Sequence, residues 1–139
     1  MGTTVSSGCF KPPLESGGRG RKGMKVLVVD HEADALIPTV SMFQVMGYDT
    51  LAARTADEAL ALVRAHLDLS VLVAEVDLKP VDGVTLARKA RHVIPTIKVV
   101  LASAFPASTM DHREGCPGEN FHLLHKPLQL SEVAIVLRR

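Results

Sequence analysis

The sequence predicts an α/β fold built on a five-stranded parallel sheet with helices on both faces. Three observations predict it. Five short apolar segments, rich in Val, Leu, Ile and Ala, recur after residue 24. Segments with helical periodicity separate most of them, which is the pattern of consecutive βα units. Polar residues follow four of the five apolar segments, at the strand ends where ligands collect in parallel sheets.

Length and composition limit the organisation of the chain. Its 139 residues suffice for one compact domain. Residues 1–23 are rich in Gly, Ser and Pro, so they bury too little apolar surface to fold and are predicted to be a flexible tail before a domain at 24–139. Cys9 and Cys116 fit neither a disulfide framework nor a metal motif, and we interpret them as incidental thiols.

Charge and hydropathy exclude two classes of partner. The net charge is +1, and the tail carries four basic residues against one acidic residue, so the predicted domain is slightly acidic and no nucleic-acid surface is expected. No apolar run reaches the roughly 18 residues of a membrane span, and the N-terminus does not resemble a signal peptide. We therefore predict a cytoplasmic protein.

The first half of the domain contains two strands and two helices. Residues 25–29 form a β-branched run typical of a strand covered on both faces. Residues 34–46 have the pattern of a helix closed by Gly47, in which Pro38 is acceptable only near the first turn. Residues 48–52 predict the second strand, and a capping box at Thr55 predicts a helix continuing to His66.

The second half contains three strands. Residues 71–74, 97–101 and 121–124 are predicted strands, the first followed by a loop at 76–83 and a helix at 84–92. Residues 105–120 contain prolines and glycines, so the fourth helix is predicted to be short or irregular. Residues 131–139 predict the last helix.

Chemically active side chains stand at four of the five strand ends. Because the carboxyl ends of parallel strands meet at one edge of the sheet, they should share one crevice. One carboxylate after a strand is commonly a solvated loop residue, whereas their joint occurrence predicts a site. The residues are Asp30 and His31, Glu75 and Asp77, Ser103, and His125 and Lys126.

Four segments resemble the receiver domain of bacterial response regulators. They are VLVVDHEAD (26–34), LVAEVDLKPVDG (72–83), VVLASA (99–104) and LHKPL (124–128). The resemblance implies a flavodoxin-like (CheY-like) sheet of order 2-1-3-4-5. It also implies a signalling module rather than an enzyme, which receives a phosphoryl group from a histidine kinase on an aspartate.

The resemblance assigns a role to each matching residue. Asp30 is the first of the family's acidic pair, and His31 stands where the second acid helps to hold Mg²⁺. Glu75 falls at the phospho-acceptor position, because Gly83 lies eight residues beyond it. The remaining matches are Ser103 for the hydroxyl residue that contacts the phosphoryl group, Lys126 for the lysine before a proline, and Leu123 at the position of the switch aromatic.

Three of these residues depart from the family's pattern. His31 removes an oxygen ligand, so Mg²⁺ should bind weakly, with Asp30 as its remaining ligand. Glu75 is one methylene longer than Asp and should be a poor acceptor. Leu123 cannot swing as an aromatic side chain does. Two interpretations of Glu75 stay open: it imitates the phosphorylated state through an ion pair with Lys126, or it marks a decayed site.

We therefore expect a stand-alone atypical receiver that acts through protein contacts without normal aspartyl phosphorylation. The chain ends directly after the last predicted helix, so no output domain is expected. Its partner would be a histidine kinase, another receiver or a downstream effector, and a homodimer stays open. His31 and His125 flank the crevice and are expected to make it sensitive to pH.

Two alternatives remain at this stage. The domain could be a conventional receiver that is phosphorylated on Asp77, although Gly83 would then lie two residues too close. It could instead be a flavodoxin-like domain that binds a small ligand. Against a flavin phosphate, the loop after the first strand is acidic at Asp30 and Glu32.

Overall fold

The computed structural model describes residues 24–104 and 121–138, and their sheet has the predicted architecture. Five parallel strands lie in the order β2-β1-β3-β4-β5, as predicted. The element bounds are β1 Lys25–Val29, α1 Ala33–Val45, β2 Asp49–Ala53, α2 Ala56–Ala65, β3 Leu69–Glu75, α3 Gly83–Val93, β4 Lys98–Ser103, β5 Phe121–His125 and α5 Leu130–Arg138. The expectations for the tail and for residues 105–120 lie outside the described residues.

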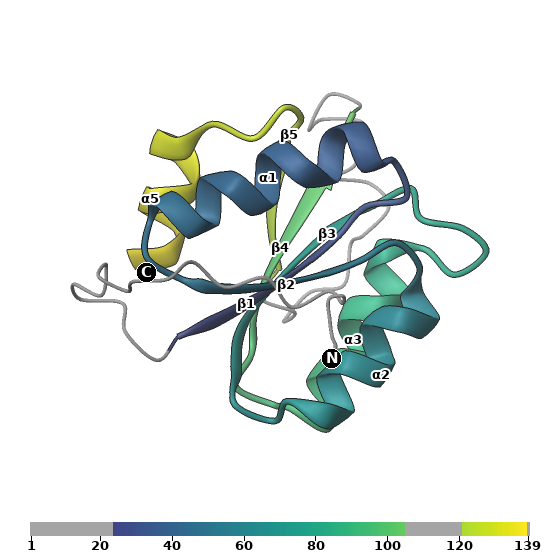
Figure 1. The fold of residues 1–139 in the computed structure, drawn as a ribbon. Helices are drawn as coiled ribbons and strands as arrows, with labels where there is room; N and C mark the ends of the chain where they lie inside the picture. The colour runs from purple at the N-terminus through teal and green to yellow at the C-terminus, as the bar shows by residue number, and fades with distance from the viewer. Residues whose placement is uncertain (1–23, 105–120, 139) are drawn as a thin grey trace.

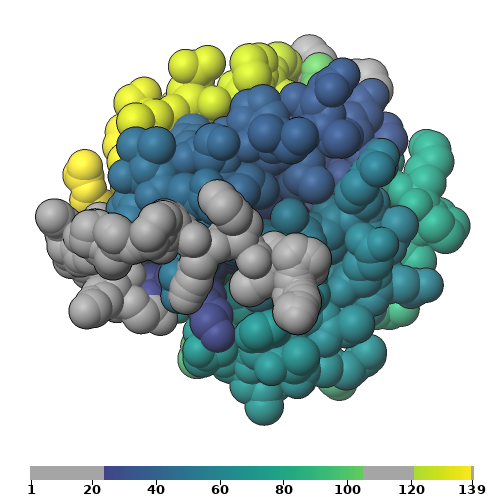
Figure 2. All heavy atoms as spheres, viewed as in Figure 1, coloured from purple at the N-terminus to yellow at the C-terminus, as the bar shows by residue number. Residues whose placement is uncertain are grey.

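The helices cover both faces of the sheet. Helices α1 and α5 lie on one face, and α2 and α3 lie on the other (Figure 1). Two buried apolar clusters correspond to these layers: one joins the sheet to Leu36 and Phe43 of α1 and Val133 of α5, and the other joins it to α2 and α3. Figure 2 shows α1 and α5 side by side at the surface of the first layer. In the described ranges, no helix is long and apolar enough to span a membrane.

The end of α1 shows why the sequence changes from helix to strand at Gly47. Gly47 has a φ of 96°, which a side-chain-bearing residue rarely adopts. Its N–H donates to the carbonyl of Gln44, and the N–H of Tyr48 donates to that of Phe43, so the end is a Schellman motif. The rings of Phe43 and Tyr48 meet edge to face at 5.8 Å. The predicted cap at Gly47 is confirmed.

The prediction for Pro38 is wrong. Pro38 is an interior residue of α1, beyond the first turn, and the helix continues through it to Val45. A proline there removes one intrahelical hydrogen bond. Nearby, the hydroxyl of Thr39 donates to the carbonyl of Ala35 at 3.0 Å. Packing of Leu36 and Phe43 against the sheet supplies the stabilisation that helix propensity lacks.

The strand registers bring the predicted polar residues to one edge. Glu75 is the last residue of β3 and pairs with Ala102 of β4, and Ser103 pairs with His125 of β5. Asp30 follows β1 directly, so the carboxyl ends of β1, β3, β4 and β5 form one edge of the sheet.

Candidate functional site

Two buried carboxylates and one lysine form the centre of this edge. Asp30 and Glu75 are 5% and 4% exposed. The Nζ of Lys126 lies 3.0 Å from Oδ2 of Asp30 and 3.1 Å from Oε1 of Glu75. The predicted ion pair between Glu75 and Lys126 is therefore present. Burial of a carboxylate is costly unless the carboxylate is paired and hydrogen-bonded. Here the single ammonium of Lys126 pairs with both carboxylates.

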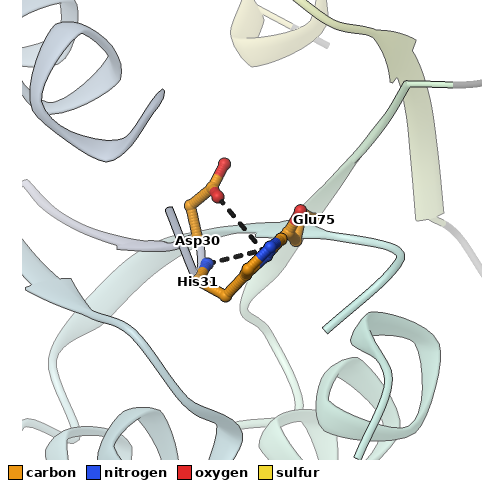
Figure 3. Close-up of side chains that lie close together, drawn as sticks. All are labelled: Asp30, His31 and Glu75. Carbon is orange, nitrogen blue, oxygen red and sulfur yellow. Dashed lines mark hydrogen bonds and ion pairs between the residues drawn. The ribbon is translucent and has the colours of Figure 1, made fainter. Parts of the chain in front are cut away.

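His31 engages the other oxygen of Glu75. The main-chain N–H of His31 donates to Oε2 of Glu75 at 2.8 Å, and Nδ1 of its ring contacts the same oxygen (Figure 3). The His31 side chain remains 51% exposed, so Glu75 is contacted on this side by a group that is open to solvent. Both oxygens of Glu75 thus have partners.

The contacts shift three pKa values. The hydrogen bond to Glu75 raises the pKa of His31 despite some desolvation. Burial alone would raise the pKa of Glu75, but hydrogen bonds from His31 and the contact with Lys126 lower it overall. Burial acts to lower the pKa of Lys126, and Asp30 and Glu75 outweigh it, so that pKa is raised. Each shift favours the charged form, so the pocket is a network of ions.

Arg54 belongs to this network, and sequence reasoning missed it. It lies just after β2, and its Nη2 and Nε donate to the carbonyl of His31 at 2.9 and 3.3 Å. The main-chain N–H of Arg54 donates to Glu58 in the first turn of α2. Arg54 follows a strand of the same sheet, so the strand-end rule that identified the other residues could have found it.

Gly83 fixes the position of Glu75 relative to α3. A Cβ on Gly83 would overlap the carbonyl oxygen of Glu75 and lie 2.9 Å from its carbonyl carbon. The N–H of Gly83 donates to the carbonyl of Val76 at 3.0 Å. Glycine is therefore required where the start of α3 passes the end of β3.

The other predicted residues surround the ion network. Ser103 is buried at the end of β4, and its carbonyl accepts the N–H of Lys126 at 2.7 Å. Leu123 packs against the apolar cluster under α2 and α3. Asp77 is half-buried in the turn after β3, and the ion pairs of Lys126 go instead to Asp30 and Glu75. His125 is exposed at the end of β5.

Mg²⁺, the ion that the resemblance implies, does not fit these residues. Mg²⁺ requires near-octahedral oxygen ligands. Here His31 presents a ring nitrogen where a second acid would stand, so an oxygen ligand is missing, and the Lys126 ammonium offsets one of the two carboxylate charges. We derive no chemical step through Mg²⁺.

The chain thus has a parallel sheet of order β2-β1-β3-β4-β5 with an acid–lysine cluster at its carboxyl edge, and comparisons with solved structures find the same fold in receiver domains. No family model matches the chain. A response regulator receiver protein from Sinorhizobium medicae is 22% identical, with a TM-score of 0.72, over 84% of this chain and 93% of that chain. The signal receiver domain of an HD domain-containing protein from Pseudomonas fluorescens is 24% identical, with a TM-score of 0.73, over 84% and 93%.

A chemotaxis protein, CheY4 of Vibrio cholerae, is similar to the same extent. It is 19% identical, with a TM-score of 0.73, over 84% of this chain and 97% of that chain. At such identities the likeness establishes the fold. The chain has the CheY-like fold of response regulator receiver domains.

Proposed function

We propose that this chain is an atypical receiver domain of two-component signalling that acts through protein contacts and does not accept a phosphoryl group at Glu75. Its fold is that of receiver domains. The resemblance of its sequence matches Asp30, Ser103 and Lys126 to residues of their pocket and places Glu75 where they have an aspartate. The observation that carries the proposal is the complete engagement of the Glu75 carboxylate.

An acceptor carboxylate must present one oxygen in line with the incoming phosphorus. In this pocket Oε1 of Glu75 contacts Lys126, and Oε2 contacts both the main chain and the ring of His31. Attack by either oxygen would first have to break an ionic contact inside a largely buried site. The longer side chain and the unsuitable Mg²⁺ position add to this barrier.

The same contacts support a fixed conformational state. Lys126 joins the ends of β1, β3 and β5, and the ion pair that Glu75 forms with it is charge-assisted. A carboxylate one methylene longer than Asp brings its charge toward the place of a phosphoryl group. We infer that Glu75 holds the pocket in one state, with a single charge where an aspartyl-phosphate would carry about two.

Recognition by another protein would then be the output of the domain. The partner class that follows is a histidine kinase, another receiver or a downstream effector. In one similar structure, the matching domain is the receiver domain of the hybrid histidine kinase CckA. Regulation in this chain would come from partner binding rather than from phosphorylation.

Small-ligand binding is the less favoured function. A cavity of about 210 Å³ lies between α1, the sheet and the segment around Pro127. Sites for drug-sized ligands typically have volumes of about 300–1,000 Å³. Three of the four charged residues that line this cavity, Asp30, Glu75 and Lys126, already pair with one another, which leaves Asp34 as the fourth.

Intact mass measurement after incubation with acetyl phosphate and Mg²⁺ tests the proposal. The wild-type chain should gain no phosphoryl group. The matched control is the double variant His31→Asp/Glu75→Asp, which restores both acids and should gain one. A phosphoryl group on the wild-type chain that Asp77→Asn abolishes would establish the conventional receiver instead.

A further inference from the structure

The unsuitability of the pocket for Mg²⁺ raises the question of which ion its residues would accept. Nδ1 of His31, one oxygen of Asp30 and one oxygen of Glu75 all lie within 4.8 Å of one another. They come from two strand ends and face a common point (Figure 3). Imidazole nitrogen with carboxylate oxygen is a donor set that suits Zn²⁺ and similar borderline transition metals.

We propose that Asp30, His31 and Glu75 form a binding site for Zn²⁺ or a similar borderline divalent metal, in place of the Mg²⁺ site that the fold suggests. This deepens the proposed function, because an ion held there would stabilise the same closed pocket. Three protein ligands would leave a fourth position open to water or to a group from a partner protein.

Lys126 does not occupy the atoms that the metal needs. It contacts Oδ2 of Asp30 and Oε1 of Glu75. The opposite oxygens, Oδ1 and Oε2, face Nδ1 of His31, the first at 3.9 Å and the second in contact. Each carboxylate can therefore bridge the lysine and the metal, and the lysine offsets one of the two negative charges.

Main-chain groups orient the two carboxylates. Oδ1 of Asp30 accepts the N–H of Glu32 at 3.0 Å, and Oε2 of Glu75 accepts the N–H of His31 at 2.8 Å. Arg54 holds the carbonyl of His31 at 2.9 Å. Such outer contacts fix the direction of metal ligands and are worth about 10–100-fold in metal affinity.

Only a small rearrangement separates the present geometry from a coordinated one. Metal–ligand bonds of about 2.1 Å in a tetrahedron place neighbouring ligand atoms about 3.4 Å apart. Coordination would require the half-exposed ring of His31 to turn away from Oε2 of Glu75, with which it is now in contact, and toward Oδ1 of Asp30, which lies 3.9 Å from Nδ1. Because a metal-bound imidazole nitrogen must be deprotonated, binding of the ion at Nδ1 would release a proton wherever that nitrogen carries one.

Calorimetric titration of the metal-stripped full chain with Zn²⁺ tests this proposal. The expected result is one Zn²⁺ per chain, with affinity at least about tenfold lower in His31→Ala. The matched control, His92→Ala, removes an exposed histidine in the last turn of α3, outside the site, and should leave the affinity unchanged. His31→Asp should lose Zn²⁺ affinity and gain Mg²⁺ affinity. Far-ultraviolet circular dichroism of each variant checks that it is folded.

The visible absorption spectrum of bound Co²⁺ provides a second test, on the wild-type chain itself. Co²⁺ in this site should give visible d–d bands without the thiolate charge-transfer bands that Cys9 or Cys116 would produce. No Zn²⁺ binding, equal binding in His31→Ala, or a thiolate spectrum would each overturn the proposal. None of these results depends on phosphoryl acceptance, so the proposed function can stand or fail separately.

Discussion

Glu75 and Lys126 are the residues on which the pocket's electrostatics depend. Among the described residues, two groups form ion pairs with both Asp30 and Glu75: the Lys126 ammonium and the His31 ring. The Lys126 side chain is 21% exposed and the carboxylates are almost fully buried. Because the desolvation of a carboxylate is costly, the loss of this lysine should be felt mainly through the charges it leaves behind.

Lys126→Met should lower the free energy of unfolding by about 2–3 kcal/mol, somewhat less than the loss of a fully buried partner, because His31 still faces Glu75. Urea denaturation measures it. Lys79→Met, at an exposed position, is the control and should stay within about 0.5 kcal/mol of wild type. In the double variant Lys126→Met/Glu75→Gln, part of the loss should be recovered, with a coupling energy of about 1–3 kcal/mol. Strict additivity would contradict the ion pair.

For individual residues, the sequence predicted which side chains share the site better than which atoms they contact. The resemblance to receiver domains, which rests in part on the spacing from Glu75 to Gly83 and on the Lys-Pro pair at 126–127, suggested the Glu75–Lys126 ion pair as one of two interpretations of Glu75. His31 was predicted as a missing oxygen ligand and as a pH-sensitive residue beside the crevice, and not as a partner of Glu75. Its double contact with Glu75 depends on the path of the main chain after β1, which brings both its N–H and its ring to one oxygen. Local sequence does not encode that path.

At the scale of elements, the passage of α3 across the end of β3 decides where Glu75 lies. Gly83 begins α3, and Asp82 caps it by accepting the N–H of Thr85 at 2.8 Å. The absence of a side chain at Gly83 lets the helix start against the Glu75 carbonyl. Any side chain at this position should therefore push β3 and α3 apart.

Gly83→Ala should destabilise the domain by about 2 kcal/mol or more, because the clash is with main-chain atoms that cannot move independently. Gly47→Ala is the comparison: it introduces only an unfavourable positive φ and should cost about 1 kcal/mol. Thermal or urea unfolding of both variants measures the difference. Equal losses would show that α3 has room to shift.

Most elements could be predicted from the sequence because their apolar periodicity is strong. The observed bounds of β1, α1 and β2 lie within one residue of the predicted ones. Two differences have physical reasons. Strand β3 begins at Leu69, two residues earlier than predicted, since Ser70 interrupts the apolar run. Helix α1 tolerates Pro38 because tertiary packing outweighs the lost hydrogen bond.

At the scale of the whole molecule, the order of the strands in the sheet brings the site residues together. Order 2-1-3-4-5 places β1 and β3 side by side and β4 and β5 next to them, so that Asp30, Glu75 and Lys126 meet although the last two are 51 positions apart. The alternation of strands and helices predicted a parallel sheet, and the resemblance to receivers supplied its order. The state of the pocket was beyond the sequence, because it depends on which oxygen each cation contacts.

The central claim is that Glu75 holds the domain in one state that phosphorylation does not change. Two-dimensional amide NMR spectra of the full chain, with and without acetyl phosphate and Mg²⁺, test it most directly. The wild-type signals of β4 and β5, including those of Ser103 and Leu123, should stay in place, whereas those of His31→Asp/Glu75→Asp should move. If the wild-type signals of β4 and β5 shift as those of the variant do, the domain is a working phosphorylation switch and the account is wrong.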